Sequence, residues 1–418
     1  MNNLAATSGN AGPKVRSDCE IQLELTGEGG IVIDLVSKVK SLFGKDITRQ
    51  CVDILNFFGV KNAVVKINDS GALPFVITAR MEAAMKQLIG DIPEYLPELI
   101  SENTVPTQPD RFRFTRLYVP GNTPSLMINA GLHSADGIIL DLEDSVAPQK
   151  KNEARILVRN ALRQIDFRGA ERMVRINQGE QGLEDLHWIV PHYVNLILVP
   201  KCEEPDHIRK ISNRIQEILN ENRITYAVYL MPIIESALGI ENAFTIARSA
   251  ENIVALAIGL EDYTADLGVP RTDEGRESLY ARYRLVNAAK AAGIQPIDSV
   301  FSDIDDMEAL KQNVIASKSM GFEGMGCIHP RQVPVVRNGF APGKEEIERA
   351  IKITDAFREA EKKGTGVVAL GSKMIDQPVV IRAGKTLDLA KKLGLLPSAN
   401  EGGLSGEPIH AHVSPDES

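Results

Sequence analysis

From about residue 113 onward, short apolar runs of strand length alternate with longer amphipathic segments of helical period. The apolar runs are residues 116–120, 137–143, 172–177, 195–201, 226–235, 253–262, 295–300 and 321–330. Runs that are apolar at nearly every position are typical of parallel strands buried on both faces. Eight strand and helix pairs within roughly 250 residues are the pattern of a (β/α)8 barrel. The sequence therefore predicts an α/β fold with a TIM (β/α)8 barrel over residues 113–340.

The chain before residue 96 follows a different pattern. Strand-like alternation at 19–25 and 62–69 is mixed with helical periodicity at 47–59 and 74–90, which indicates a small α+β domain. We expect this domain to span residues 11–95, after a flexible N-terminus at 1–10. A proline-containing stretch without periodicity, 96–112, is predicted to be a linker.

Beyond the barrel, residues 341–398 are predicted to form a C-terminal helical extension, because most of this segment has helical periodicity. The last residues, 399–418, are polar and rich in Gly and Pro. Such a composition buries too little apolar surface to fold, so we expect a disordered tail.

Charged or polar residues stand where most of the predicted barrel strands end. They are Asp141, Glu143, Asp144, Arg175, Asn177, Lys201, Glu203, Glu235, Glu261, Asp262 and His329. A single charged residue at this position is often only the point where a strand meets solvent. The carboxyl ends of barrel strands, however, share one face, where active sites lie. Carboxylates from adjacent strands, without matching His or Cys, favour a hard cation such as Mg²⁺ held with waters. Arg175 would complement an anionic substrate or a developing oxyanion.

Composition narrows the class of protein. The net charge is −9 and Lys and Arg do not cluster, which argues against a nucleic-acid partner. Cysteines are few and contain no C-x-x-C pair, so neither a disulfide framework nor a zinc site is predicted; they are Cys19, Cys51, Cys202 and Cys327. No apolar run approaches membrane-span length and no signal peptide is evident. We expect a cytoplasmic protein with no membrane partner.

Seven motifs occur in order along residues 113–395: "RLYVPGN", "DGIILDLEDSVAPQKKNEAR", "VRIN", "LVPKCE", "IIESALGI", "GLEDYTADLG" and "CIHPRQ". Together they resemble the citrate lyase β-subunit family, within the Mg²⁺-dependent barrel aldolases and acyl-CoA lyases. The resemblance implies cleavage of a 3-hydroxyacyl thioester, citryl or a close relative, into an acetyl thioester and a 2-keto acid such as oxaloacetate.

The resemblance also implies a role for individual residues. The metal ligands would be Glu235 and Asp262, and Arg175 would stabilise the enolate oxygen. Arg116 would meet substrate or thioester phosphates. Supporting acids that orient metal-bound water and arginine would be Asp141, Glu143 and Asp144.

In this family, an aspartate from a C-terminal segment of a neighbouring subunit is the usual candidate for protonating the enolate carbon. The corresponding segment here is "GSKMIDQP", and the residue is Asp376. The local sequence fits equally well a helix N-cap ahead of "QPVVIRA".

Two other strand-end residues have alternatives. A lysine at a barrel strand end can form a Schiff base, so Lys201 is the candidate for a metal-independent mechanism. The proline after His329 indicates a tight turn, which favours a structural or thioester-contact role over a general base.

Residues 11–88 resemble the citrate lyase acyl carrier protein, the γ subunit, which bears a phosphoribosyl-dephospho-CoA prosthetic group on a serine. The family pattern is S-[GS]-D with the first serine modified, whereas this chain has Arg16-Ser17-Asp18. The attachment site is therefore either displaced to Ser17 or absent. We expect Ser17, although this serine would also suit a simple strand start.

The leading hypothesis is a fused γ–β part of citrate lyase that acts on citryl-carrier or citryl-CoA. The implied partners are an α acyl transferase subunit and further copies of the chain in a trimer-based oligomer. One alternative is a stand-alone citramalyl-CoA or malyl-CoA lyase with a degenerate carrier domain. Another is a non-catalytic carrier scaffold, which predicts gaps among the catalytic positions; none of Arg175, Glu235, Asp262 and Asp376 is missing.

Overall fold

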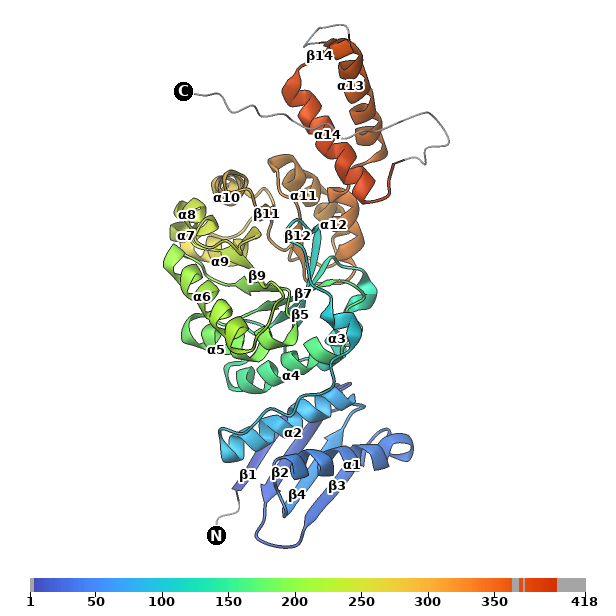
Figure 1. Ribbon diagram of the computed structural model, residues 1–418, viewed down its shortest axis with the longest axis vertical. Coiled ribbons are helices and arrows are strands. Elements are labelled where there is room, and N and C mark those ends of the chain that lie inside the picture. Colours follow the sequence, from blue (N-terminus) through green and yellow to red (C-terminus); the bar gives the residue numbers. More distant parts are fainter. Residues whose placement is uncertain (1–3, 363–367, 371–372, 397–418) are drawn as a thin grey trace. The chain divides into compact units, whose positions relative to one another are not determined.

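The computed structural model describes residues 4–362, 368–370 and 373–396 (Figure 1). The chain divides into two compact units, residues 1–340 and 341–418. The first unit holds the N-terminal domain and the barrel. The predicted tail at 399–418 lies outside the described residues. In the part of the chain that is described, no helix combines the length and apolarity needed to cross a bilayer.

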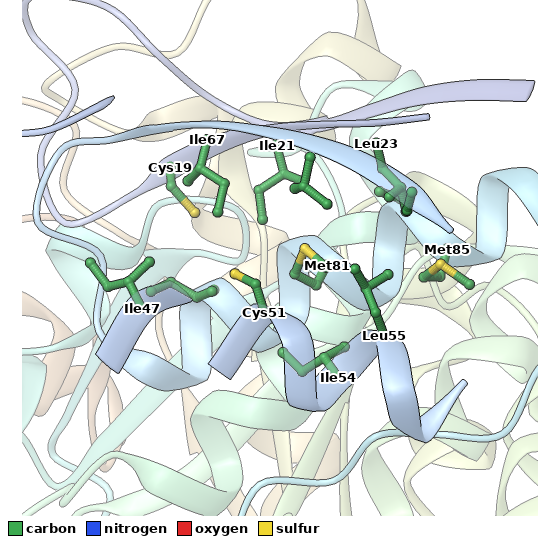
Figure 2. Packing of buried hydrophobic residues seen from close by; sticks show 14 of the residues in the cluster. Cys19, Ile21, Leu23, Ile47, Cys51, Ile54, Leu55, Ile67, Met81 and Met85 are labelled. Atoms are coloured by element: carbon green, nitrogen blue, oxygen red, sulfur yellow. The ribbon is translucent and has the colours of Figure 1, made fainter. Parts of the chain in front are cut away.

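The N-terminal domain is a four-stranded sheet with two helices on one face (Figure 1). The strand order is β1-β2-β4-β3, with β1 Leu4–Gly9, β2 Cys19–Leu25, β4 Ala63–Asp69 and β3 Ile31–Ser37; the helices are α1 Lys40–Phe57 and α2 Pro74–Ile89. Alternation in β2 points Cys19, Ile21 and Leu23 into the core. Figure 2 shows them facing the helix residues Cys51 and Met81. The predicted α+β domain is confirmed.

The strand β1 corrects one expectation. Residues 1–10 were expected to be flexible, but Leu4–Gly9 pairs antiparallel with β2 along its whole length. The segment "LAATSG" has few large apolar side chains, so its sequence carries only a weak strand signal. It is held mainly by backbone hydrogen bonds to β2, and the buried Ser8 hydroxyl donates to the Arg80 carbonyl oxygen at 2.5 Å.

The barrel prediction is confirmed by an eight-stranded parallel sheet of order β11-β10-β9-β8-β7-β6-β5-β12. Its strands are β5 Thr115–Pro120, β6 Gly137–Asp141, β7 Glu171–Arg175, β8 Leu196–Val199, β9 Tyr229–Ile234, β10 Ala255–Ile258, β11 Gln295–Ile297 and β12 Met325–Cys327. An isolated parallel bridge between Asp298 and Met325 brings the two ends of the sheet together. Each predicted apolar run overlaps one of these strands.

Helices surround the strands (Figure 1). They are α3 Pro124–Met127, α4 Lys151–Gln164, α5 Gly179–Ile189, α6 Pro205–Glu221, α7 Ala237–Glu241, α8 Ala243–Ala247, α9 Leu260–Leu267, α10 Leu279–Ala292, α11 Met307–Met320 and α12 Gln332–Phe340. The apolar stripe of α6 shows the principle: Ile208, Ile211, Ile215 and Ile218 are buried at helical spacing.

The segment expected to be a linker is packed against the barrel. Arg113 and Glu171 are both fully buried and form two hydrogen bonds, Nε to Oε2 at 2.7 Å and Nη2 to Oε1 at 2.8 Å. The Thr107 hydroxyl donates to the same Glu171 carboxylate at 2.6 Å. This end of the barrel lies opposite the carboxyl ends of the strands, so these contacts contribute to stability rather than to the active site.

We expect Arg113→Leu to lower the free energy of unfolding by about 3–5 kcal/mol, because the substitution leaves the Glu171 carboxylate buried without its cation. Urea unfolding followed by circular dichroism measures the change. Arg209→Ala, which removes an exposed pair with Asp206, is the control and should change stability by less than about 1 kcal/mol. An equal effect of the two substitutions would contradict the prediction.

The second unit consists of α13 Lys344–Lys362, β13 Val368–Leu370, β14 Lys373–Ile375 and α14 Gln377–Lys392. The strands pair antiparallel, and the two helices pack on a small core that includes Ile353, Phe357, Ile375 and Val380. The extension expected over 341–398 thus contains a hairpin as well as helices.

Candidate active site

A cavity of about 470 Å³ opens at the carboxyl ends of the barrel strands. It is lined by most of the residues that the sequence analysis selected: Arg116, Asp141, Asp144, Arg175, Glu235 and Asp262. Glu143 does not line the cavity but contacts Arg175 with its carboxylate at 2.9 Å. Strands distant in sequence therefore bring the predicted acids and arginines to one pocket.

Glu235, directly after β9, is almost fully buried, with 6% of its surface exposed. Its Oε1 accepts a hydrogen bond from the Lys201 backbone N–H at 2.7 Å. Its Oε2 lies over Gly259, where an added Cβ would come within 2.4 Å of it. Burial, together with the nearby Asp262 and Glu143 carboxylates, raises the pKa of Glu235 to about 8. Among the described residues, no Lys or Arg forms an ion pair with this carboxylate.

Asp262 lies in the first turn of α9 and lines the pocket. The Lys201 ammonium is 3.6 Å from Asp262 Oδ1. Burial alone would lower the pKa of Lys201, but Asp262, followed by Asp144, Glu143 and Glu235, raises it. A charged ammonium has no free electron pair for attack on a carbonyl, so the surroundings of Lys201 disfavour the Schiff-base alternative.

Glu235 and Asp262 fit a hard divalent cation. Both side chains line the pocket, and the pKa of Glu235 is raised mainly by burial, with a further contribution from the nearby Asp262 and Glu143 carboxylates. Among the described residues, no group of three or more His, Cys, Asp or Glu side chains has metal-binding geometry. Two protein carboxylates suit Mg²⁺, which keeps several waters and takes further oxygens from its substrate.

We expect Mg²⁺ to bind more weakly as the pH falls below about 8, because a proton on Glu235 competes with the metal.

In the metal-free protein, the raised pKa of Glu235 also makes the folding stability depend on pH, but in the opposite direction. The native pKa lies above the usual value of 4.5, so stability should fall as the pH rises from about 4.5 to 8, by at most about 1.4 kcal/mol per unit. Calorimetric titration with Mg²⁺ and thermal unfolding in EDTA at pH 6, 7 and 8 measure both trends. A Mg²⁺ affinity that does not change with pH would contradict the assignment.

Arg175, at the end of β7, is fixed by the acids of the β6 end. Its Nε and Nη2 donate to Asp141 Oδ1 and Oδ2 at 2.7 and 2.8 Å. Although burial would raise the pKa of Asp141, its hydrogen bonds with Arg175 lower it. The guanidinium also lies over the Tyr118 ring, 5.4 Å from the centroid. This bidentate geometry holds a permanent positive charge at the pocket.

Arg116 lies deeper, on β5, and is 1% exposed. Its Nη1 contacts Met231 Sδ at 3.0 Å and its Nη2 contacts the Asp298 carbonyl oxygen at 3.5 Å. Neither partner is a carboxylate, Nε has no hydrogen-bond partner in the described part of the chain, and burial lowers the pKa of Arg116 to about 10. A buried guanidinium without a counter-ion favours binding of an anionic group from the pocket.

The pocket also contains polar residues that the sequence pattern did not indicate, among them Tyr118, Asp298 and Ser299. Asp298 pairs with the buried Arg282, and Ser299 Oγ accepts from the Leu260 backbone N–H at 3.1 Å, at the start of α9. Asp298 and Ser299 directly follow β11 within the seventh apolar run, so their position at a strand end could have indicated them. Tyr118 is interior to its run, and nothing in the pattern separates it from a core aromatic.

Asp376 belongs to the second unit and is the N-cap of α14, where its side chain accepts from the Val379 backbone N–H at 3.4 Å. This is the N-cap alternative that its local sequence suggested; it does not test a role in proton transfer. His329 Nδ1 accepts from the Arg331 backbone N–H at 3.2 Å, and His329 does not line the cavity.

Ser17 lies in a turn with φ of +55°, and its backbone N–H donates to the Ser70 carbonyl oxygen at 3.0 Å. A left-handed backbone favours glycine. Ser17 thus suits the middle position of the S-[GS]-D pattern, with the exposed Arg16 in the first position. The following Asp18 is buried and bound by Arg80 through two hydrogen bonds of 3.0 Å.

Comparison with known proteins matches residues 115–330 to the HpcH/HpaI aldolase/citrate lyase family. Residues 7–88 match a second family, the malonate decarboxylase delta subunit, an acyl carrier protein family. The resemblance of the N-terminal domain to an acyl carrier protein is thus supported, although the matching family takes its name from the carrier of another enzyme, malonate decarboxylase.

Among individual proteins, the chain is 36% identical to citrate lyase subunit beta of Leuconostoc mesenteroides over 296 residues, 69% of this chain and 97% of that protein. It is 33% identical to human mitochondrial citramalyl-CoA lyase, over 66% of this chain and 85% of that protein. The solved structure of CitE from Mycobacterium tuberculosis with magnesium, acetoacetate and coenzyme A is 28% identical, with a TM-score of 0.57, covering 67% of this chain and 98% of that one.

Proposed function

The chain belongs to the HpcH/HpaI aldolase/citrate lyase family, and from this premise we propose that it cleaves a citryl thioester into an acetyl thioester and oxaloacetate with Mg²⁺. The observation that carries the proposal is one pocket that holds two carboxylates and two arginines, Glu235, Asp262, Arg175 and Arg116. A related CitE structure contains magnesium and coenzyme A, which supports the same cofactor and thioester class here.

Each residue has a defined task in this proposal. The chemistry that Mg²⁺ supplies, when held by Glu235 and Asp262, is polarisation of the substrate hydroxyl and its neighbouring carboxylate. Arg175, fixed by Asp141, stabilises the negative charge that develops on the thioester oxygen as the carbon–carbon bond breaks. Arg116 binds a carboxylate of the substrate. Asp376 of a neighbouring subunit donates the proton to the enolate carbon.

A second candidate substrate is supported by the N-terminal turn. With Arg16 in the first position of the carrier pattern and Ser17 in a left-handed turn, a serine at the usual attachment position is missing. A chain without the prosthetic group would cleave free CoA thioesters, such as citramalyl-CoA or malyl-CoA. The similarity to human citramalyl-CoA lyase favours the same alternative.

The fused carrier implies an assembly. For a modified Ser17, we propose that an α acyl transferase subunit loads the arm and that the chain forms a trimer-based homo-oligomer. The scaffold alternative is disfavoured, since the pocket is formed and none of its expected acids and arginines is replaced.

The test is a substrate panel on the purified full-length chain. We expect citryl-CoA cleavage that EDTA abolishes and Mg²⁺ restores, with slower cleavage of citramalyl-CoA and malyl-CoA. Borohydride with substrate should trap no adduct on Lys201; an adduct there, with activity in EDTA, would overturn the metal mechanism. Intact mass of the protein from its native cells shows whether Ser17 carries a prosthetic group.

A further inference from the structure

We propose that the N-terminal domain is locked in one position on the barrel, so that a prosthetic arm on Ser17 reaches the barrel pocket of its own chain and not the barrel pocket of another copy. The inference rests on the proposed function, because it assumes an arm on Ser17. The lock is the interdomain charge cluster, which consists of Arg80 and Glu82 of α2 with Glu153 and Arg159 of α4.

The centre of the interdomain charge cluster is the pair Glu82–Arg159. Arg159 Nη1 and Nη2 donate to Glu82 Oε1 and Oε2 at 2.9 and 2.6 Å, and both side chains are fully buried. Arg159 also lies 3.3 Å from Glu94, just beyond α2. Separating the domains would break a bidentate pair and expose the surface that buries it. Removing one partner alone would leave an uncompensated buried charge.

A second set of contacts joins residues at the start of α4 to Gly9, the last residue of β1. Glu153 Oε2 accepts from the Gly9 backbone N–H at 2.7 Å and lies 3.5 Å from Arg80 Nη1. Lys150 Nζ donates to the Gly9 carbonyl oxygen at 3.0 Å. One barrel carboxylate therefore binds both the backbone and a side chain of the N-terminal domain.

Arg80 links the Ser17 turn to the pocket rim. It binds Asp18, the residue after Ser17, and its Nη2 donates to the Asn122 carbonyl oxygen at 3.4 Å. Asn122 lies in the loop after β5, where the Gly121 backbone N–H donates to the Asp141 carbonyl oxygen at 2.7 Å. Since Asp141 lines the pocket, a series of contacts through Arg80 and the loop after β5 connects the turn to the site.

The connector restricts the domain further. Asn103 is buried and donates to the carbonyl oxygens of Leu162 and Ile165, both at 2.8 Å. Arg163 Nε donates to the Pro97 carbonyl oxygen at 2.6 Å. A carrier on a flexible linker would move as a body and visit other sites. Here the N-terminal domain is held on the barrel at both of its ends, so only the prosthetic arm moves. The high effective concentration of the attached thioester is therefore that at the barrel pocket of the same chain.

A complementation experiment tests delivery within one chain. Ser17→Ala supplies a pocket without an arm, and Glu235→Gln supplies an arm without an active pocket. The arm thiol is acetylated with acetic anhydride, then oxaloacetate and Mg²⁺ are added. The enolate carbon of the acetyl group forms a bond to the keto carbon, the proton that it loses ends on the new hydroxyl, and the arm gains the mass of one oxaloacetate.

We expect the wild-type arm to be converted and the Glu235→Gln arm to stay unconverted when co-expressed or mixed with Ser17→Ala. Conversion of that arm at the wild-type rate in the mixture would overturn the proposal. The proposed function fails in a different way, when the acetylated arm of the wild-type protein does not react with oxaloacetate. A wild-type protein that carries no arm by intact mass overturns the premise that Ser17 is modified, and the present proposal with it.

The lock itself is tested without any arm. Trp188 is the single tryptophan of the chain, and Lys86 of α2 lies over its ring at 4.9 Å. We expect Glu82→Leu to increase acrylamide quenching of Trp188, with far-UV circular dichroism unchanged, and Glu82→Leu/Arg159→Leu to restore protection because an apolar pair replaces the charges. The control is the exposed Arg209→Ala. Unchanged quenching in Glu82→Leu would overturn the lock.

Discussion

Glu235→Gln is expected to lower kcat by at least about 10³-fold, because the substitution removes one of the two carboxylates that fit Mg²⁺ while keeping the shape of the side chain. Calorimetric titration should show no Mg²⁺ binding at concentrations that saturate the wild-type protein. The substitution should not unfold the chain. Burial raises the pKa of Glu235 to about 8, so at pH 7 the metal-free side chain is largely neutral, as glutamine is.

The stability measurement separates this role from a structural one. In EDTA, the melting temperature of Glu235→Gln should equal or exceed that of the wild type, whereas Mg²⁺ should stabilise only the wild type. The matched control is Glu241→Gln, an exposed carboxylate on α7 that accepts from the Tyr280 hydroxyl at 2.8 Å. Wild-type activity in Glu235→Gln, or an equal loss of activity in Glu241→Gln, would contradict the assignment of Glu235 as a metal ligand.

Periodicity was sufficient to predict the barrel, because each buried parallel strand is an apolar run that ends in polar residues. The same rule placed Glu235 and Asp262 at one rim, since carboxyl ends of barrel strands share a face. It could not reveal that the Lys201 backbone, rather than its side chain, binds Glu235, because this depends on the left-handed backbone at Lys201, with φ of +49°.

The linker shows the limit of local patterns more clearly. Prolines and missing periodicity predict a linker at 96–112, yet Asn103 and Thr107 within it are buried and form hydrogen bonds with the barrel. The same holds for Arg80 and Glu82, which lie on the α2 face that packs on α4. A charged residue in a helical pattern is normally assigned to solvent. Such a residue becomes part of a buried ion pair only when a partner of opposite charge, far along the chain, packs against it, and the local sequence does not reveal this partner.

Arg175→Lys is expected to lower kcat by about 10²–10³-fold, the range seen when one donor to a developing oxyanion is removed. Lysine keeps the charge but cannot form the two parallel hydrogen bonds to Asp141. The ammonium would also lose the planar contact with the Tyr118 ring, so its position in the pocket would be less defined.

The comparison with Arg172→Lys distinguishes transition-state stabilisation from packing. Arg172 lies on the same strand, β7, but near the opposite end of the barrel, where it donates to the Tyr193 and Val105 carbonyl oxygens. Arg172→Lys should lower stability with kcat within about twofold of wild type, because it lies away from the reacting atoms. For Arg175→Lys, kcat should fall more than the melting temperature explains, and Mg²⁺ affinity should stay near that of the wild type. If Arg175→Lys instead lost Mg²⁺ binding with unchanged kcat at saturating metal, Arg175 would organise the carboxylates and some other donor would stabilise the enolate.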